Sequence, residues 1–339
     1  MAAYDPPRIA GAALGAIALA AGGSALYAAL HGRRVAREDH PPLGRFVTVD
    51  GVRLHYVDIG PRDAPPILFV HGNGACLDDM LVSGLIDACA RRYRCIVPDR
   101  PGYGHSSRPS GRGYAPADQA DLMRAFLARI GVEAPLVVGH SWGSLLALAM
   151  ALDPRGPVQG AVLMSGFYYP QEGGDPAVLG LPSVPVLGRA LVWTLGIPTI
   201  RQLAPRLYAR LFHPHPVPEH MLETYPFGYG ERPEQIRAAA AELAVMQSAA
   251  QALMPRYGAC PVPVALLHGA EDKAIAATLH TERLAGEIPG ARSALLPGLG
   301  HMIHYFAHRA ILAAIDETMA RATAVRSSGA ARAASRAAE

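Results

Sequence analysis

The sequence predicts an α/β fold: a mostly parallel sheet flanked by helices, with a helical lid inserted between late strands and a membrane helix in front. Strand-like apolar runs alternate with helix-like periodic segments as far as residue 167. Between Tyr168 and Cys260 the alternation stops, prolines are dense and the periodic stretches are helical. From residue 261 the alternation resumes. An insertion between late strands would cover the strand ends, where ligands bind in open α/β sheets.

The first part of the core is expected over residues 41–167. Two alternating segments meet at Asp50-Gly51, which is a hairpin signal. The elements that follow are expected to be a strand at 66–70, a helix over roughly 78–93, a strand and loop in "RCIVPDRPGYGHS", a helix at 116–131, a strand at 135–140, a helix at 142–153 and a strand at 158–165.

The lid is expected over residues 168–260 and the second part of the core over 261–322. The clearest helical pattern in the lid lies at 233–254. The second part of the core is expected to contain a strand in "PVPVALLHGAED", a helix near 278–287, a strand in "ARSALLPGLGH" and a last helix from about 304 to 321.

Residues 1–40 are interpreted as a single-pass membrane anchor and linker. The run from Ile9 to Leu30 contains no charged residue and is long enough to span a bilayer. One arginine precedes it and three follow closely, which would leave the next domain in the cytoplasm. The alternative is a cleaved export signal with a small-residue site in "SALYAA", but the length of the run and the arginines after it argue against cleavage.

Composition limits the remaining possibilities. The chain has 339 residues, half of them apolar, and a formal charge of +3, which argues against a nucleic-acid-binding surface. Its four cysteines form no CxxC pair, and no group of His, Cys and carboxylate residues has the spacing of a zinc site. We therefore expect no metal. Residues 323–339 lack apolar periodicity and are expected to form a disordered tail.

The stretch "VVGHSWGS" contains the strongest chemical signal. Ser141 lies between an apolar strand and a helix, with glycines at 139 and 143. This Gly-x-Ser-x-Gly pattern is typical of a nucleophile elbow, a sharp turn that exposes the serine hydroxyl. The alternative is a glycine-bearing turn whose serine only caps the helix.

A serine nucleophile needs a general base and a group that orients this base. Among the histidines after the insertion, His301 follows "LLPGLG" in the loop after the last strand, at the same end of the sheet as Ser141. Asp272, in "HGAED", follows the preceding strand, and the adjacent Glu271 is the alternative acid. Backbone N–H groups of Asn73, in "VHGNGA", and of Trp142 are the candidate donors to an oxyanion.

The motifs "HGNG", "DRPGYGHS", "GHSWGS", "HGAED" and "GLGH" occur in the order found in the α/β-hydrolases, which this chain resembles over roughly residues 44–321. The resemblance implies Ser141 as nucleophile, Asp272 as orienting acid, His301 as base, and Asn73 and Trp142 as oxyanion donors, with no metal and no organic cofactor.

Asn73 together with Trp142 is similar to the haloalkane dehalogenase branch of that family, whose nucleophile is an aspartate. This chain differs because it has Ser141 there. Alkylation of a serine would give an ether, which offers no carbonyl to water, so dehalogenation is not expected. "SWGS" also resembles the proline iminopeptidases, but "HGNG" lacks the proline typical of their oxyanion loop.

We therefore expect a serine hydrolase that cleaves a small or medium apolar carboxylic ester through an acyl-enzyme. One alternative is carbon–carbon bond hydrolysis or cofactor-free perhydrolysis on the same triad. Another is a non-enzymatic accessory protein tethered to the membrane. Expected partners are the small-molecule ester and, through the N-terminal helix, the membrane.

Overall fold

The computed structural model describes Gly23 and residues 40–111, 113–156, 158–171, 176–184, 186–192 and 196–337. These residues form one eight-stranded mixed sheet with the order β1-β2-β4-β3-β5-β6-β7-β8. The strands are β1 (Arg45–Val49), β2 (Val52–Ile59), β3 (Pro66–Val70), β4 (Arg94–Pro98), β5 (Leu136–His140), β6 (Gly160–Met164), β7 (Val264–Gly269) and β8 (Arg292–Leu296).

The sheet is parallel except at its first edge. β2 pairs antiparallel with β1 and β4, and all neighbours from β4 to β8 are parallel. Every residue of β5, β6 and β7 is buried, which explains why these strands are continuous apolar runs rather than alternating ones. The prediction of a mostly parallel sheet is confirmed.

The edge hairpin is confirmed at the predicted turn. Val49 pairs with Val52, and the two residues between them have positive φ, 49° at Asp50 and 78° at Gly51. Positive φ at both central residues is the geometry of a two-residue hairpin turn, and Asp-Gly adopts it readily.

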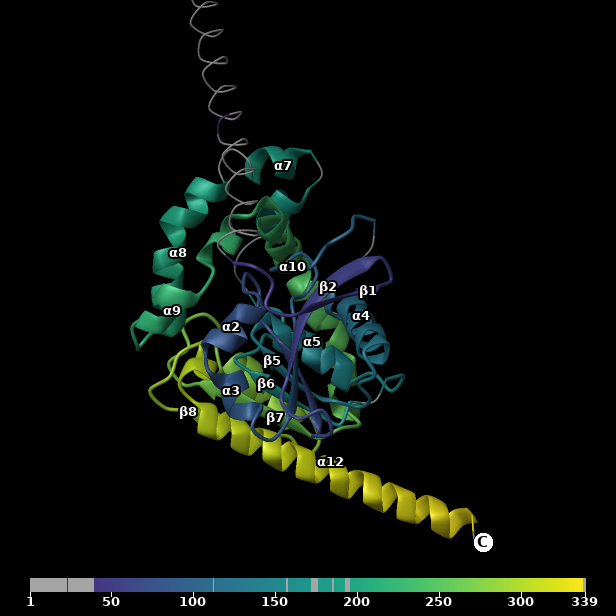
Figure 1. The fold of residues 1–339 in the computed structure, drawn as a ribbon. Coiled ribbons are helices and arrows are strands. Elements are labelled where there is room, and N and C mark those ends of the chain that lie inside the picture. The colour runs from purple at the N-terminus through teal and green to yellow at the C-terminus, as the bar shows by residue number, and fades with distance from the viewer. Residues whose placement is uncertain are drawn as a thin grey trace, which may run out of the picture.

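Helices cover both faces of the sheet (Figure 1). One hydrophobic core joins α4 (Pro116–Arg129) and α5 (Trp142–Ala151) to the sheet, and residues of α11 (Arg283–Glu287) belong to it. A second core joins α2 (Leu77–Val82), α3 (Leu85–Cys89) and the first half of α12 (His308–Ala337) to the sheet. These layers support the strand ends that carry the candidate site.

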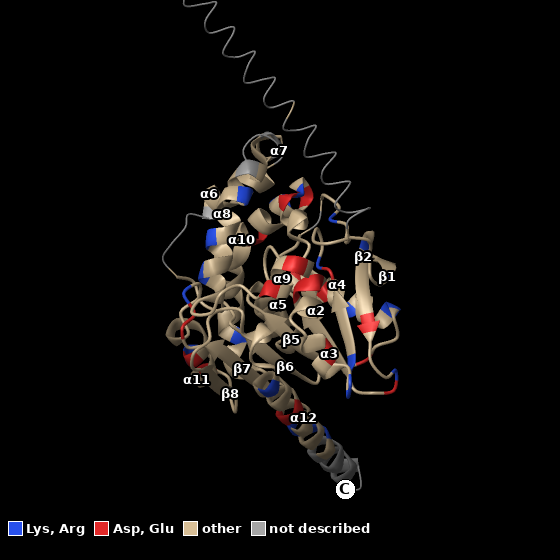
Figure 2. Cartoon of the chain, turned by 60° about the vertical axis from the view of Figure 1, so that its left-hand side comes forward, with Lys and Arg blue, Asp and Glu red and all other residues tan. Residues whose placement is uncertain are grey.

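The regular elements in the described part of the insertion between β6 and β7 are all helical, and we refer to residues 168–260 as the lid. Figures 1 and 2 show these helices gathered on the side of the sheet away from α12. They are α6 (Pro176–Gly180), α7 (Leu187–Leu191), α8 (Ile197–Phe212), α9 (Glu219–Thr224) and α10 (Pro233–Leu253).

The structure differs from the expected helices in three places. The helix expected over 78–93 is divided by Gly84, whose φ of 76° ends α2 before α3 begins. The segment 278–287 starts as a π-helix at Thr278–Glu282 and continues as α11. Residues 323–337 of the expected disordered tail are instead part of α12, because their many alanines and arginines favour helix even without an apolar stripe.

The predicted membrane helix lies, apart from Gly23, outside the described residues. Among the described residues, no helix has both the length and the apolar character needed to cross a bilayer.

Candidate active site

Ser141 lies at the turn between β5 and α5 in a backbone conformation that side chains rarely adopt, with φ 54° and ψ −121°. The flanking glycines are required by close contacts. A Cβ on Gly139 would lie 2.3 Å from the carbonyl oxygen of Gly143, and one on Gly143 would lie 2.3 Å from that of Val70. The turn is therefore packed tightly against the end of β3, and its strain is held in place by the surrounding strands.

The loop after β3 lies beside this turn. A Cβ on Gly72 would be only 3.3 Å from the Cβ of Ser141, so the backbone that leads to Asn73 passes next to the serine. Trp142 is the first residue of α5, where a helix leaves its N–H without an intrahelical partner. Gly72, the residue before Asn73, and Trp142 thus both adjoin Ser141 at the elbow.

Asp272 and His301 are brought together from two loops at the carboxyl ends of β7 and β8. Nδ1 of His301 lies 2.7 Å from Oδ2 of Asp272. The other carboxylate oxygen accepts the N–H groups of Ala274 (2.7 Å) and Ile275 (3.0 Å), which fixes the side chain. Burial alone would raise the pKa of Asp272, but the charge and hydrogen bonds of His301 and His268 outweigh it and hold that pKa well below its usual range.

The alternative acid and the other histidines take different positions. Glu271 is exposed, whereas the Asp272 side chain is 1% exposed and faces His301. His268 supports the acid, with Nε2 3.0 Å from Asp272 Oδ2. His280 accepts the backbone N–H of Tyr168 (3.0 Å), and His308 contacts the carbonyl oxygen of His304 (2.8 Å). Of the five histidines after the lid, only His301 lines the cavity that contains Ser141.

That cavity has a volume of about 550 Å³ and lies between the core and the lid. Ser141 and His301 form its floor, together with Gly72 and Asn73 of the loop after β3. Its remaining walls are mainly apolar side chains of α8, α9 and α10, among them Ile200, Leu207, Leu211, Met221, Ile236 and Leu243. Tyr168 and Tyr169, where the lid begins, are buried and are not among the residues of this cavity.

The side chain of Asn73 points to the lid. Its amide lies 3.1 Å from each of three acceptors, the Tyr103 hydroxyl, the Ala239 carbonyl and Oε2 of Glu242. The indole Nε1 of Trp142 is buried and has no hydrogen-bond partner among the described residues, while the guanidinium of Arg100 lies 4.3 Å from the indole ring.

Glu242 of α10 is the centre of a buried polar network that the sequence did not reveal. Its carboxylate pairs with Arg100 and accepts hydrogen bonds from the Tyr103 hydroxyl (2.6 Å) and from Gln119 Nε2 (2.9 Å). Burial would raise the pKa of Glu242, but the charge of Arg100 holds it below the usual value. A single carboxylate in the alanine-rich "RAAAAELAV" is the signal that could have identified it.

Arg100 connects this network to the oxyanion loop. Its guanidinium donates to the carbonyl oxygens of His71 (3.0 Å) and Gly72 (2.8 Å), and its backbone N–H donates to Nε2 of His71 (3.0 Å). Burial and the neighbouring Arg100 lower the pKa of His71 to about 4, so the ring is neutral and supports the loop. These contacts make His71 a support of the loop rather than a proton carrier.

A second buried group lies beneath His301. The carboxylate of Asp79 accepts a hydrogen bond from the Tyr305 hydroxyl (3.0 Å), and its other oxygen lies 3.0 Å from Nε2 of His304. Nε2 of His140 lies 3.0 Å from the carbonyl oxygen of His301. Asp79, His140 and His304 are the residues of the described chain that could hold a metal ion, since their ligand atoms lie within 4.8 Å of one another. They are already linked by an ion pair and ring contacts, and the sequence had not indicated the group because its members are far apart in the chain.

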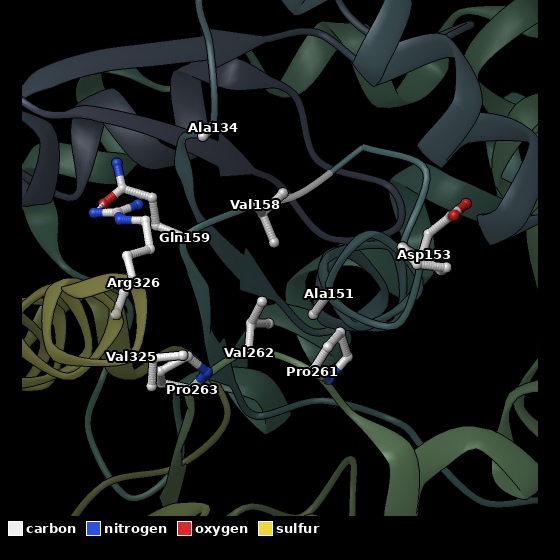
Figure 3. A pocket seen from close by; sticks show the side chains of 12 residues that line it. Ala134, Ala151, Asp153, Val158, Gln159, Pro261, Val262, Pro263, Val325 and Arg326 are labelled. Carbon is white, nitrogen blue, oxygen red and sulfur yellow. Dashed lines mark hydrogen bonds between the residues drawn. The ribbon is translucent and has the colours of Figure 1, made fainter. Parts of the chain in front are cut away.

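A smaller cavity of about 360 Å³ lies at the opposite ends of β6 and β7 (Figure 3). Apolar residues such as Val158, Val262 and Val325 line it. Its carboxylate, Asp153, is paired with Arg124 (2.9 Å) and Arg155 (2.6 Å). The candidate catalytic residues are therefore concentrated at the lid side of the sheet.

Comparison with known proteins agrees with this architecture. The family model for the alpha/beta hydrolase fold matches residues 65–307. Haloalkane dehalogenase 2 of Mycobacterium tuberculosis (strain ATCC 25618 / H37Rv) is 31% identical over 284 residues, covering 82% of this chain and 95% of that protein. A bifunctional esterase/perhydrolase of Acinetobacter calcoaceticus is 37% identical over 124 residues, covering 36% of this chain and 44% of that protein.

Among solved structures, the haloalkane dehalogenase DbeA from Bradyrhizobium elkani USDA94 superposes with a TM-score of 0.62 at 21% identity, covering 83% of this chain and 98% of that one. At this identity the likeness concerns the fold. The match of the family model over most of the chain, with the parallel sheet, the elbow and the helical lid, shows that this protein belongs to the alpha/beta hydrolase fold family.

Proposed function

We propose that this protein is a serine hydrolase that cleaves carboxylic esters of small or medium apolar substrates. The proposal is based on one observation. Ser141, at its strained elbow, lines the same apolar cavity as His301, and Nδ1 of His301 is paired with the buried carboxylate of Asp272. A serine that lines a cavity, a base and an orienting acid at one end of a sheet are the components of acyl transfer.

The reaction follows from the roles of these groups. Nε2 of His301 accepts the proton of Ser141 as the serine oxygen attacks the ester carbonyl, and Asp272 stabilises the imidazolium. The backbone N–H groups of Asn73 and Trp142 hold the oxyanion. His301 then gives its proton to the departing alcohol. A water molecule deprotonated by His301 attacks the acyl-enzyme, and as the carboxylic acid leaves, His301 returns the proton to the oxygen of Ser141.

The cavity supports an apolar acyl group. A volume of about 550 Å³ is within the range of about 300–1,000 Å³ that small-molecule sites occupy. Its walls from α8 and α10 offer methyl and methylene groups but few polar partners for an acyl chain. We expect hydrolysis to improve from acetate to longer acyl chains until the cavity is filled.

The relatives suggest two other chemistries. Dehalogenation is disfavoured because an alkylated Ser141 would be an ether, and because the Asn73 amide is already bonded to Tyr103, Ala239 and Glu242. Perhydrolysis is the second candidate, favoured by the similarity to an esterase/perhydrolase. There, hydrogen peroxide would replace water in the attack on the same acyl-enzyme and release a peracid.

The test treats the purified full-length chain in detergent with a fluorophosphonate and follows labelling by intact mass. We expect one label in the wild type and in Ser248→Ala, an exposed-serine control on α10, and none in Ser141→Ala. In parallel, four kinds of substrate distinguish the chemistries. Ester hydrolysis is measured with p-nitrophenyl esters from acetate to decanoate, and perhydrolysis with an acyl substrate and hydrogen peroxide. Carbon–carbon bond hydrolysis is measured with a vinylogous substrate, and dehalogenation with 1-bromobutane. Bromide release without ester turnover would overturn the proposal, and a folded chain with neither label nor turnover would favour the accessory-protein alternative.

We further propose that residues 9–30 anchor the protein in a membrane with the hydrolase domain in the cytoplasm. The support is the uncharged run and the arginines that follow it. The full chain should stay in carbonate-washed membranes, and the domain should resist protease in intact spheroplasts. A shortened mature mass would instead identify a cleaved export signal.

A further inference from the structure

The lid helix α10 separates two cavities. The catalytic cavity lies on one side of it, and a cavity of about 620 Å³, which we call the outer pocket, lies on the other. The outer pocket is formed by the loop 102–110 and Tyr114 of the core, by Ser183 of the lid and by the first turns of α10. Nothing in the proposed ester hydrolysis uses it.

The charge of the outer pocket is strongly positive. Arg108 comes from the core loop, and Arg232 and Arg237 come from the start of α10. The carboxylate among the lining residues belongs to Glu234, which is exposed. The hydroxyl groups of Ser106, Ser107, Ser110 and Ser183 are also among the lining residues.

The three arginines are only partly used by the protein. Nη1 of Arg108 donates to the Pro101 carbonyl oxygen (3.0 Å), and Arg232 donates to that of Gly104. Arg108 lies 3.9 Å from Glu242, whose charge is shared with Arg100, and burial lowers the pKa of Arg108. Nε of Arg237 is buried and has no hydrogen-bond partner within the described chain. A buried donor without a partner is costly, so this pocket is suited to an acceptor that the protein does not itself supply.

We propose that the outer pocket binds a phosphate group. Guanidinium groups bind phosphate oxygens through paired N–H donors. The hydroxyls of Ser107 and Ser110 can donate to the remaining oxygens, whereas those of Ser106 and Ser183 already donate to backbone carbonyl oxygens. The arginines approach from two separate segments, so a tetrahedral anion with several acceptor oxygens can satisfy them together. The phosphate can belong to free inorganic phosphate or to a lipid headgroup.

A bound phosphate would join the lid to the core. On α10, Gln235, Ile236 and Ala239 line the catalytic cavity, whereas Arg237 and Ala238 line the outer pocket. The same helix start already contacts the core loop, since Gln235 accepts the N–H of Gly104 (3.1 Å). An anion held between Arg108 and Arg237 adds a second connection, and it therefore stabilises the α10 wall of the catalytic cavity.

Binding is measured without catalysis, so its result is independent of the proposed hydrolase activity. Calorimetry with the full-length Ser141→Ala chain in detergent uses inorganic phosphate, with sodium chloride of equal ionic strength as the blank. We expect saturable binding that weakens at least tenfold in Arg237→Gln and stays within twofold in Arg206→Gln. Arg206 is the matched control because it is an exposed arginine on the lid helix α8 outside the pocket. Hydrogen exchange of residues 233–243 should slow when phosphate is bound.

A second variant keeps the test valid if Arg237→Gln folds poorly. Ser110→Asp places a negative charge at an exposed position of the pocket and should also weaken phosphate binding at least tenfold. Dihexanoyl phosphatidic acid below its micelle concentration identifies the source. Tighter binding than inorganic phosphate, lost in the same variants, indicates a lipid headgroup, and equal binding indicates free phosphate. Binding no stronger than the chloride blank, or unchanged in both variants, would overturn the proposal.

Discussion

Asp272 determines how well the base can work. In Asp272→Asn the amide can still fill the space, but it no longer stabilises a protonated His301 and can hold the ring in the wrong tautomer. We expect kcat for p-nitrophenyl butyrate to fall by about 10⁴, with little change in the urea midpoint. Glu271→Gln is the control, because this neighbouring carboxylate is exposed, and it should stay within twofold of wild type. The reverse pattern would transfer the acid role to Glu271.

His71 makes stability depend on pH. The folded ring accepts the Arg100 N–H at Nε2 (3.0 Å). Burial of the ring and the charge of the neighbouring Arg100 lower the pKa of His71 in the folded chain to about 4 from 6.5. The unfolded chain therefore binds a proton at pH values where the folded chain does not. The stabilisation is complete above pH 6.5 and is lost as the pH falls towards 4, by up to about 3 kcal/mol.

Urea midpoints between pH 7.5 and 4.5 measure this loss. His71→Gln should be less stable at pH 7.5 but lose less stability on acidification than wild type. His215→Gln, at an exposed histidine, should keep the wild-type slope. Equal slopes for wild type and His71→Gln would show that His71 does not resist protonation in the folded protein.

Some of the site's residues could be located from sequence and others could not. Ser141, Asp272 and His301 each follow a recognisable strand, and parallel strands bring their carboxyl ends to one edge. Glu242 contacts Arg100 and Gln119 across 142 and 123 residues of sequence, and no local pattern specifies such a partner.

At the scale of the element, α10 is held to the core by one buried charge. Glu242→Gln would leave Arg100 buried without its counter-charge, although Arg100 keeps its carbonyl partners at His71 and Gly72. We expect a loss of about 3–5 kcal/mol in the free energy of unfolding, measured with urea. Glu234→Gln removes an exposed carboxylate from the same helix and should change stability by less than about 0.5 kcal/mol in phosphate-free buffer. Similar losses in both variants would contradict the role of the buried pair.

Element boundaries show what local sequence leaves open. The periodicity of 78–93 fits one helix, yet Gly84 adopts a left-handed conformation and separates α2 from α3. A Cβ there would lie 3.3 Å from the His308 ring, a contact with a distant segment. In α12 the case is reversed: residues 323–337 lack an apolar stripe, which predicts disorder, but their alanine content favours helix.

At the scale of the whole molecule, the alternation of strands and helices predicted a parallel sheet, and the antiparallel edge came from the hairpin. The strand order could not be predicted from this alternation. β3 lies between β4 and β5, so the chain crosses over before the elbow. This crossover decides that the loop after β3 and the elbow after β5 are neighbours, as the pairing of Val70 with Gly139 shows.

Exposed apolar side chains gather on the lid. Among the residues that the structure describes, thirteen large apolar side chains are exposed and nine of them belong to the lid; two of these, Leu179 and Leu207, also line the catalytic cavity. The cavity is therefore continuous with an apolar surface, and such surfaces mark contacts with apolar partners.

We expect turnover of p-nitrophenyl decanoate to rise several-fold when phospholipid vesicles are added, because the lid can meet the bilayer in which a long-chain ester dissolves. Val186→Ser with Leu187→Ser should remove most of that rise, since these side chains are 81% and 53% exposed, while the soluble butyrate ester is turned over as before. Val325→Ser, at an exposed valine of α12, is the matched control and should leave the rise intact. An equal rise in the lid variant and the control would mean that the exposed lid residues do not deliver the substrate.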